Sequence, residues 1–278
     1  MLIDTHCHLC FNAYKDDVDT VIQRAFTDDI HMVVPGSQRD TSARAVALAD
    51  RYEQGVYAAV GLHPAHVHSF NYDDKVGDEK IQFVTREEEY DQAYYRSLAQ
   101  SSKKVVAIGE IGIDNFIVSQ FEDRERVLTD QIAVLGAQLD LADELELPVI
   151  IHSRNSTDVI LEILRRRYPG GRPHGGVAHF FADAIDVARS YFDLGFLISF
   201  TGVITFAKEY HEVIKTAPLE KIMIETDSPY VTPHPYRGKR NEPSNVRYIA
   251  ETIAQIKGVS FEDVARQTTQ NAIDLFQL

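Results

Sequence analysis

Short apolar runs alternate with longer amphipathic stretches along the whole chain. Eight of these runs are rich in β-branched and other apolar residues, as buried strands are. They are Leu2–Thr5, His31–Pro35, Val56–Val60, Val105–Ile108, Val149–Ile151, Gly176–His179, Phe196–Ser199 and Ile222–Glu225. Most of them are followed by a stretch whose apolar residues have helical spacing, so the pattern predicts repeated βα units.

The predicted helices lie between these strands and after the last one. They are Val18–Asp29, Ser42–Gln54, Arg86–Ser101, Phe121–Glu146, Ser156–Tyr168, Asp183–Leu194, Thr205–Thr216, Asn245–Lys257 and Ser260–Leu275. Eight βα repeats predict an α/β protein that forms a slightly elaborated TIM (β/α)8 barrel, as one domain over residues 1–278. The alternative is a doubly wound open sheet, but no glycine-rich nucleotide loop follows the first strand.

Side chains that can bind metal stand at the ends of several apolar runs. His6 and His8 follow the first run, and alternate residues of a strand face the same way, so both imidazoles can reach one ion while Cys7 points away. Four later runs also end on residues of this kind, namely Glu110, His152, His179 and Asp227. Since the C-terminal strand ends of a barrel form one face, these six residues predict a metal centre.

The order of the strands predicts that Glu110 bridges two ions. It stands midway in that order, so its two oxygens can join an ion on His6 and His8 to an ion on the two later histidines. Asp227, on the strand beside the first, would complete the first ion's shell and face the bound water. Imidazole and carboxylate together suit zinc, manganese, iron or nickel, and magnesium is a further candidate for turnover.

Composition limits the cellular setting and the partners. The chain has 278 residues, 44% of them hydrophobic, which is enough for a large core, and no run reaches the roughly 20 apolar residues of a membrane span. Its first residues enter a strand at once, and its two cysteines make no disulfide framework, so we expect a cytoplasmic protein. The net charge of −14 disfavours extensive wrapping of nucleic acid but permits a metal-centred site that touches few phosphates.

Several residues near the predicted centre are candidates to bind substrate. The loop 232–243 reads TPHPYRGKRNEP and places Arg237 and Lys239 just past the last strand, where their charges suit a phosphate. Arg154 follows the fifth strand, and His63, in GLHP, ends the third strand on the same rim. A merely solvated charged loop is the alternative for 232–243.

Residues Ser69–Asp91 fit the barrel pattern least well. The segment is longer than a usual βα loop and is acidic, with Asp73, Asp74, Asp78 and Glu79 followed by Glu87–Glu89. We expect an exposed excursion near the C-terminal end of the third strand, with substrate gating as the alternative to a solvated loop. His66 and His68, just before it, are expected at the surface.

Several longer motifs resemble the TatD family of metal-dependent deoxyribonucleases, within the amidohydrolase-like TIM barrels. They are IDTHCHL, GLHP, AIGEIGID, LPVIIHSR, ETDSPYVTPHPYRGKRNEP and the closing Asn271-Ala-Ile. The resemblance implies a dinuclear site on the six predicted ligands and removal of nucleotides from the 3′ end of single-stranded DNA or RNA. The chain departs from the family at Asp114-Asn115-Phe116, where an aromatic pair is common, and at His179-Phe180-Phe181, where His-Cys-Phe is common. These departures concern substrate fit more than metal binding.

The function expected from the sequence is metal-dependent hydrolysis of phosphodiester bonds at nucleic-acid ends. The ions would activate water and stabilise charge in the transition state, while Asp227 would orient or deprotonate that water. One alternative is an ester or amide hydrolase, such as an aminoacyl-tRNA deacylase. Another is a non-catalytic metal- or nucleic-acid-binding protein, which an acid at the water position disfavours. No protein partner is implied.

Overall fold

The computed structural model describes residues 1–76 and 79–278, and its main sheet confirms the predicted barrel. Eight parallel strands follow one another around it: β1 (Leu2–Asp4), β2 (Ile30–Pro35), β3 (Val56–Val60), β6 (Val105–Asp114), β7 (Val149–Arg154), β8 (Gly176–Ala178), β9 (Phe196–Phe200) and β10 (Ile222–Ile224). Just past β1, the Thr5 amide donates to the Ile224 carbonyl of β10 at 3.1 Å, and the Asp227 amide donates to His6 at 2.9 Å. These bonds nearly close the sheet, so all strand ends surround one mouth.

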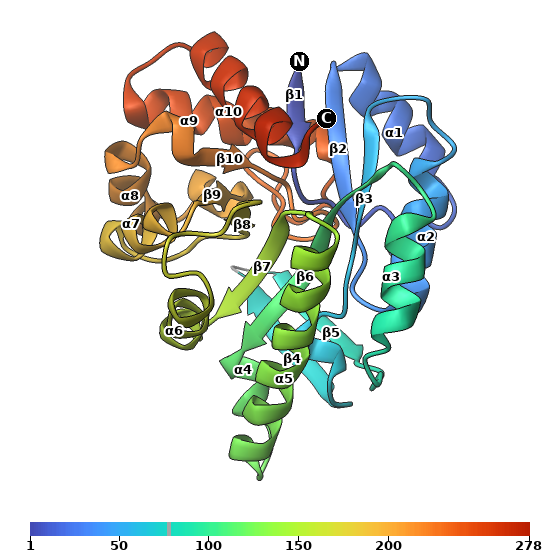
Figure 1. Ribbon diagram of the computed structural model, residues 1–278. Coiled ribbons are helices and arrows are strands. Elements are labelled where there is room, and N and C mark those ends of the chain that lie inside the picture. Colours follow the sequence, from blue (N-terminus) through green and yellow to red (C-terminus); the bar gives the residue numbers. More distant parts are fainter. Residues whose placement is uncertain (77–78) are drawn as a thin grey trace.

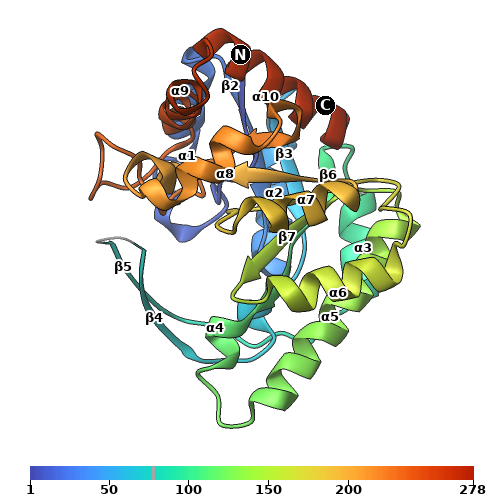
Figure 2. The ribbon, with the colours of Figure 1, turned by 90° about the vertical axis from the view of Figure 1, so that its left-hand side faces the viewer.

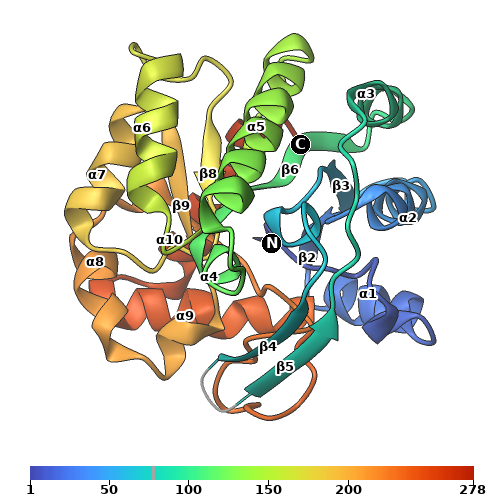
Figure 3. The same cartoon turned by 90° about the horizontal axis from the view of Figure 1, so that it is seen from below.

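The helices form a ring outside the strands, as the view from below in Figure 3 shows. They are α1 (Val18–Thr27), α2 (Arg39–Ala49), α3 (Gln92–Gln100), α5 (Arg124–Glu144), α6 (Thr157–Arg167), α7 (Ile185–Asp193), α8 (His211–Thr216), α9 (Val246–Lys257) and α10 (Phe261–Phe276). In Figure 1, α9 and α10 lie at the end where the strands begin. None of the described helices combines the length and apolar character that a membrane span requires.

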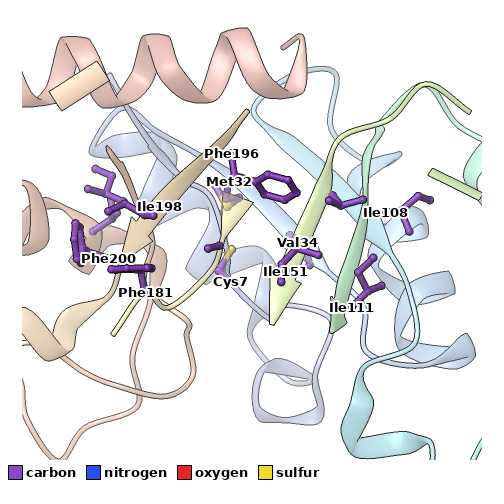
Figure 4. Close-up of a cluster of buried hydrophobic side chains, with 14 of the residues drawn as sticks. Cys7, Met32, Val34, Ile108, Ile111, Ile151, Phe181, Phe196, Ile198 and Phe200 are labelled. Atoms are coloured by element: carbon purple, nitrogen blue, oxygen red, sulfur yellow. The ribbon is translucent and has the colours of Figure 1, made fainter. Parts of the chain in front are cut away.

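Two hydrophobic clusters hold the barrel together. One contains residues from most strands, such as Ile3, Ile150 and Met223, packed against Ala272 and Phe276 of α10. Helix α10 thus closes the barrel at the end where the strands begin (Figure 1). The larger cluster joins the strands to the surrounding helices, and Figure 4 shows part of it. Because one end is filled by apolar side chains, polar groups gather at the other end, where the strands finish.

The excursion after β3 is a hairpin rather than an irregular loop. Strands β4 (Asn71–Val76) and β5 (Glu79–Val84) pair antiparallel and project from the end of the barrel where β6 and β7 finish (Figures 1 and 2). Asp78 and the side chains of residues 72–83 lie outside the described part, so the predicted exposure of the acidic side chains there stays a prediction, as does the alternative of substrate gating.

Two of the predicted helices differ clearly from the structure, and one short helix was not predicted. The helix expected from Arg86 begins only at Gln92, where the Asp91 side chain accepts from the Tyr94 amide at 3.0 Å and caps it. The helix expected over 205–216 is two short 3-10 turns followed by α8. A short helix, α4 (Asn115–Val118), directly continues β6 and was not predicted.

Candidate active site

The six predicted ligands converge at the C-terminal mouth of the barrel. On one side of Glu110, its Oε2 lies 3.2 Å from His6 Nε2 and 3.7 Å from His8 Nε2. The two imidazole nitrogens are themselves 3.2 Å apart. Asp227 Oδ1 lies 3.5 Å from His8 Nε2 and 3.9 Å from His6 Nε2. We call these groups the first side of the centre.

The other carboxylate oxygen of Glu110 faces a different set of histidines. Its Oε1 lies 2.8 Å from His152 Nδ1, 3.4 Å from His179 Nε2 and 3.3 Å from His63 Nε2. We call His152 and His179, with the groups behind them, the second side of the centre. Each oxygen of one buried carboxylate therefore belongs to a separate group of nitrogens.

The spacing of these donor atoms fits a bound cation. With ligand bonds of about 2.1 Å, neighbouring donors around an ion lie about 3.0–3.4 Å apart at octahedral or tetrahedral angles. The donors around Glu110 are separated by 2.8–3.9 Å, which overlaps this range. Lone pairs so close in a buried site repel one another unless a proton or a metal lies between them. The residues present therefore fit divalent ions on both sides.

Polar groups on the far side of two of the rings, those of His8 and His179, orient these candidate ligands. His8 Nδ1 lies 3.3 Å from the Pro35 carbonyl, so this nitrogen carries the proton and Nε2 is left for a metal. His179 Nδ1 lies 2.7 Å from Glu225 Oε1, which also accepts from the Phe180 amide at 2.7 Å. Glu225 was not among the predicted residues, although it stands only two residues before Asp227.

A second carboxylate supports His152. Asp114 Oδ2 lies 3.2 Å from His152 Nε2, and the Asp114 amide donates to Gln131 Oε1 at 3.0 Å. In the sequence, Asp114 drew notice only as part of a departure from the family pattern. The structure shows that it holds the ring of a predicted ligand between two carboxylates.

Charge and burial act oppositely on the two sides of Glu110. Burial would raise the pKa of Glu110, but the surrounding imidazoles hold it well below its usual range. Burial and the neighbouring His179 lower the pKa of His6 to about 3. Burial would also lower the pKa of His152 and His179, but adjacent carboxylates raise these to about 9 and about 10. Without metal, His152 and His179 therefore hold protons at pH 7 that His6 does not.

His63 is oriented as a donor rather than as a ligand. Its Nδ1 accepts from the Ala65 amide at 3.0 Å, so in the neutral ring the proton sits on Nε2. That Nε2 faces the cavity beside Glu110, and a protonated nitrogen cannot bind a metal. Its contact with substrate stays a prediction, since the atom that His63 Nε2 faces here is Glu110 Oε1 at 3.3 Å.

A cavity of about 510 Å³ opens over the centre. Five of the six predicted ligands line it, as do His63 and Arg154. Arg237 and Lys239 are not among the described residues of its wall: Arg237 lies over the Phe206 ring at 4.0 Å, and the Lys239 ammonium lies 5.3 Å from the Tyr236 ring.

Other residues of the wall were not predicted. His66, which was expected at the surface, lines the cavity, and burial lowers its pKa to about 3. His68 was expected there too, but its ring lies 2.9 Å from Asp130 and its side chain is only 17% exposed. Among the other additions are two arginines and three aromatic residues: Arg44, Arg86, Phe11, Phe180 and Tyr230.

The comparisons with known proteins agree with this geometry. The sequence matches the family described as TatD related DNase over residues 3–277. The chain belongs to the TatD family. Bacillus subtilis YabD, named an uncharacterized metal-dependent hydrolase, is 39% identical over 282 residues and 100% of both chains. Escherichia coli YcfH, with the same description, is 32% identical over all of this chain and 96% of its own.

A solved TatD homolog has the same fold. The crystal structure of YJJV from Escherichia coli matches with a TM-score of 0.82 and 29% identity, over 100% of this chain and 98% of that one. The chain is thus a metal-dependent hydrolase of the TatD family with an amidohydrolase-like TIM barrel. Several groups of its histidines and carboxylates are placed to hold metal.

Three of the seven described non-glycine residues with positive φ line the cavity of this TatD-family site. Phe180, Asp227 and Val231 line it with φ values of 47°, 54° and 55°, in the left-handed region that non-glycine residues rarely adopt. Such strain persists only where surrounding contacts enforce it, and it is common at functional sites. At Phe180 the bond from its amide to Glu225 is one such contact.

Proposed function

We propose that this chain is a dinuclear phosphodiesterase that removes nucleotides from the 3′ ends of single-stranded DNA or RNA. The observation that carries the proposal is Glu110, whose two oxygens each face a separate set of imidazole nitrogens. In this proposal His6, His8 and Asp227 hold one divalent ion, and the pair His152 and His179 holds the other. Zinc, manganese, magnesium, iron and nickel are the candidates.

The chain's own residues then divide the work. When bound, the ions lower the pKa of water and offset charge that develops on the phosphate. Asp227 takes the proton of the attacking water, because its carboxylate lies at the edge of the cavity beside His8. His63 donates its Nε2 proton in a hydrogen bond to the substrate, and Arg154, whose guanidinium lies over the Phe116 ring at 4.0 Å, holds a phosphate oxygen.

The choice of nucleic acid rests on the composition of the cavity wall. Single-stranded nucleic acids are bound by aromatic side chains that stack on bases together with cations that contact phosphates. Phe11, which stacks on His8 with ring centroids 4.3 Å apart, and Phe180 supply aromatic surfaces beside the centre. Arg237 and Lys239 lie outside this wall and would contact more distant phosphates of the strand. The family description, TatD related DNase, supports the same choice.

Two further proposals concern the setting. We place the protein in the cytoplasm, since Cys7 and Cys10 are buried and unpaired, as thiols are in a reducing compartment. We also propose that residues 1–278 act as one hydrolase domain, because the site combines residues that follow the first strand of the barrel with one that follows the last strand.

The test is digestion of 5′-labelled linear DNA and RNA single strands by the purified protein loaded with each candidate metal. We expect stepwise shortening from the 3′ end, and resistance of a circular single strand of the same sequence. A circle degraded as fast as the linear strand would exclude the exonuclease mode. Cleavage of an aminoacyl-tRNA ester or an amide, with no nucleic acid cut under any metal, would favour the alternative hydrolase. Metal binding without any hydrolysis would favour a binding protein.

A further inference from the structure

Two arginines that the proposed chemistry does not use stand together on the cavity wall. Arg44 comes from α2, and Arg86 follows β5 at the base of the hairpin. Both line the cavity that contains the metal ligands. Asp40 lies between them, with its Oδ2 2.9 Å from Arg86 Nη2 and 3.5 Å from Arg44 Nη2.

Neutral partners hold both guanidinium groups in place. The Gln38 side chain accepts from Arg86 Nη2 at 3.1 Å and donates to the Arg86 carbonyl at 3.0 Å, which fixes this residue at both ends. Arg44 Nη1 donates to Asn12 Oδ1 at 3.0 Å. The two side chains still expose 66% and 43% of their surface, so an incoming ligand can reach them. Such preorganisation reduces the entropy lost on binding.

The arginine pair carries one unit of positive charge more than the carboxylate that it shares. Two guanidiniums share the single Asp40 carboxylate. The carboxylates among the described residues of the cavity wall are Glu110, Asp114 and Asp227, and all three belong to the metal centre or support it. In a chain with a net charge of −14, a preformed pair of arginines with one unit of excess charge suits an anion.

We propose that Arg44 and Arg86 form a second anion subsite, which binds the phosphate next to the scissile one. This inference rests on the proposed phosphodiesterase function and adds to it a preference for substrates with at least two phosphates. The cavity has a volume of about 510 Å³, and pockets for whole small ligands have volumes of about 300–1,000 Å³. It is therefore larger than a single phosphate requires. Because Arg86 lies at the base of the hairpin, the subsite also links that excursion to the active site.

The test compares two dinucleotides that differ by one phosphate, d(TpT) and d(pTpT). In the native protein the ratio of kcat/KM for d(pTpT) to that for d(TpT) should be about tenfold or more, as expected for charge-assisted hydrogen bonds of about 1.5–3 kcal/mol. In the double variant Arg44→Gln, Arg86→Gln this ratio should fall to about one. Arg51→Gln is the matched control. Arg51 follows α2, its guanidinium lies 2.9 Å from the Asp19 carboxylate, and it is not part of the cavity wall. This variant should keep the native ratio.

A binding measurement separates this inference from the proposed function. Calorimetry of the metal-free proteins with the same two dinucleotides should show the preference for d(pTpT) in the native protein and its loss in the double variant. If that preference depends on the arginines but neither dinucleotide is cut, the phosphodiesterase proposal fails and the subsite stands. If both are cut with equal efficiency, or if the double variant keeps the native ratio, the subsite is wrong. Should the double variant melt early, the single variants must each show an intermediate ratio.

Discussion

The two sides of Glu110 have similar ligands but different groups behind them. On the first side, His8 is held by a backbone carbonyl, that of Pro35, which carries no charge. On the second side, His179 and His152 are held by the carboxylates of Glu225 and Asp114. A carboxylate behind an imidazole raises its basicity, so the second side should bind a proton or a metal ion more tightly. Two ions that share one bridging carboxylate therefore need not be bound with equal affinity.

Removing the bridge should have the largest effect, because Glu110 serves both sides. Glu110→Gln keeps the size of the side chain but removes a full negative charge from a site of six candidate ligands. We expect at least one ion to be lost per chain and hydrolysis to fall by a factor of about 10³ or more, as for loss of charge stabilisation at a buried centre. Elemental analysis and single-strand digestion check this, with the exposed Glu262→Gln as control. Two ions retained per chain would disprove the bridging role.

Asp227→Asn should separate chemistry from metal binding on the first side. The amide can still bind an ion through its oxygen but cannot take a proton from water, so turnover should fall about 10²–10⁴-fold. Metal content should stay close to that of the native protein, because the histidines and Glu110 remain. Turnover near the native value would make Asp227 a spectator ligand.

Glu225→Gln tests whether the carboxylates explain the difference between the sides. The variant keeps an oxygen near His179 and the Phe180 amide but removes the charge, so affinity for the second-side ion should fall about 10–100-fold. Affinity for the first-side ion should change little. Competition with a metal chelator, followed by elemental analysis, measures each step. Equal weakening of both ions would mean that Glu225 supports the fold of the mouth and not one site.

The convergence of the six candidate ligands was predictable from sequence because each stands at or just past the end of an apolar run. A parallel barrel brings such ends together whatever the loops do, so His6, Glu110 and Asp227 could be assigned to one site. The partners behind the rings could not, since which carboxylate meets which imidazole depends on side-chain packing. Glu225 stands only two residues before Asp227, so of these partners it was the one closest to a signal in the sequence.

The arginines on the cavity wall were less predictable than the candidate ligands. Arg44 lies in an ordinary amphipathic helix, and Arg86 was placed in a helix that begins only at Gln92. Their position on the cavity wall depends on how α2 and the hairpin base pack together, which no local pattern encodes. Conversely, the basic loop with Arg237 and Lys239 attracted attention by its charge, but the structure places both side chains over aromatic rings outside the wall.

Proton release on metal binding is the smallest effect expected, and it bears most directly on the difference between the two sides of Glu110. With pKa values of about 9 and about 10, His152 and His179 are protonated at pH 7 in the metal-free protein, whereas His6, with a pKa of about 3, is not. A ligand nitrogen must be unprotonated, so filling the second side should release up to two protons and filling the His6 position none. Affinity for the second-side ion should therefore rise with pH up to about 10 and then level off.

Calorimetric titration in buffers of different ionisation enthalpy counts the protons released on metal binding. Glu225→Gln should lower the count, because the pKa of His179 falls without its carboxylate; equal release for both ions would contradict the proposed inequality.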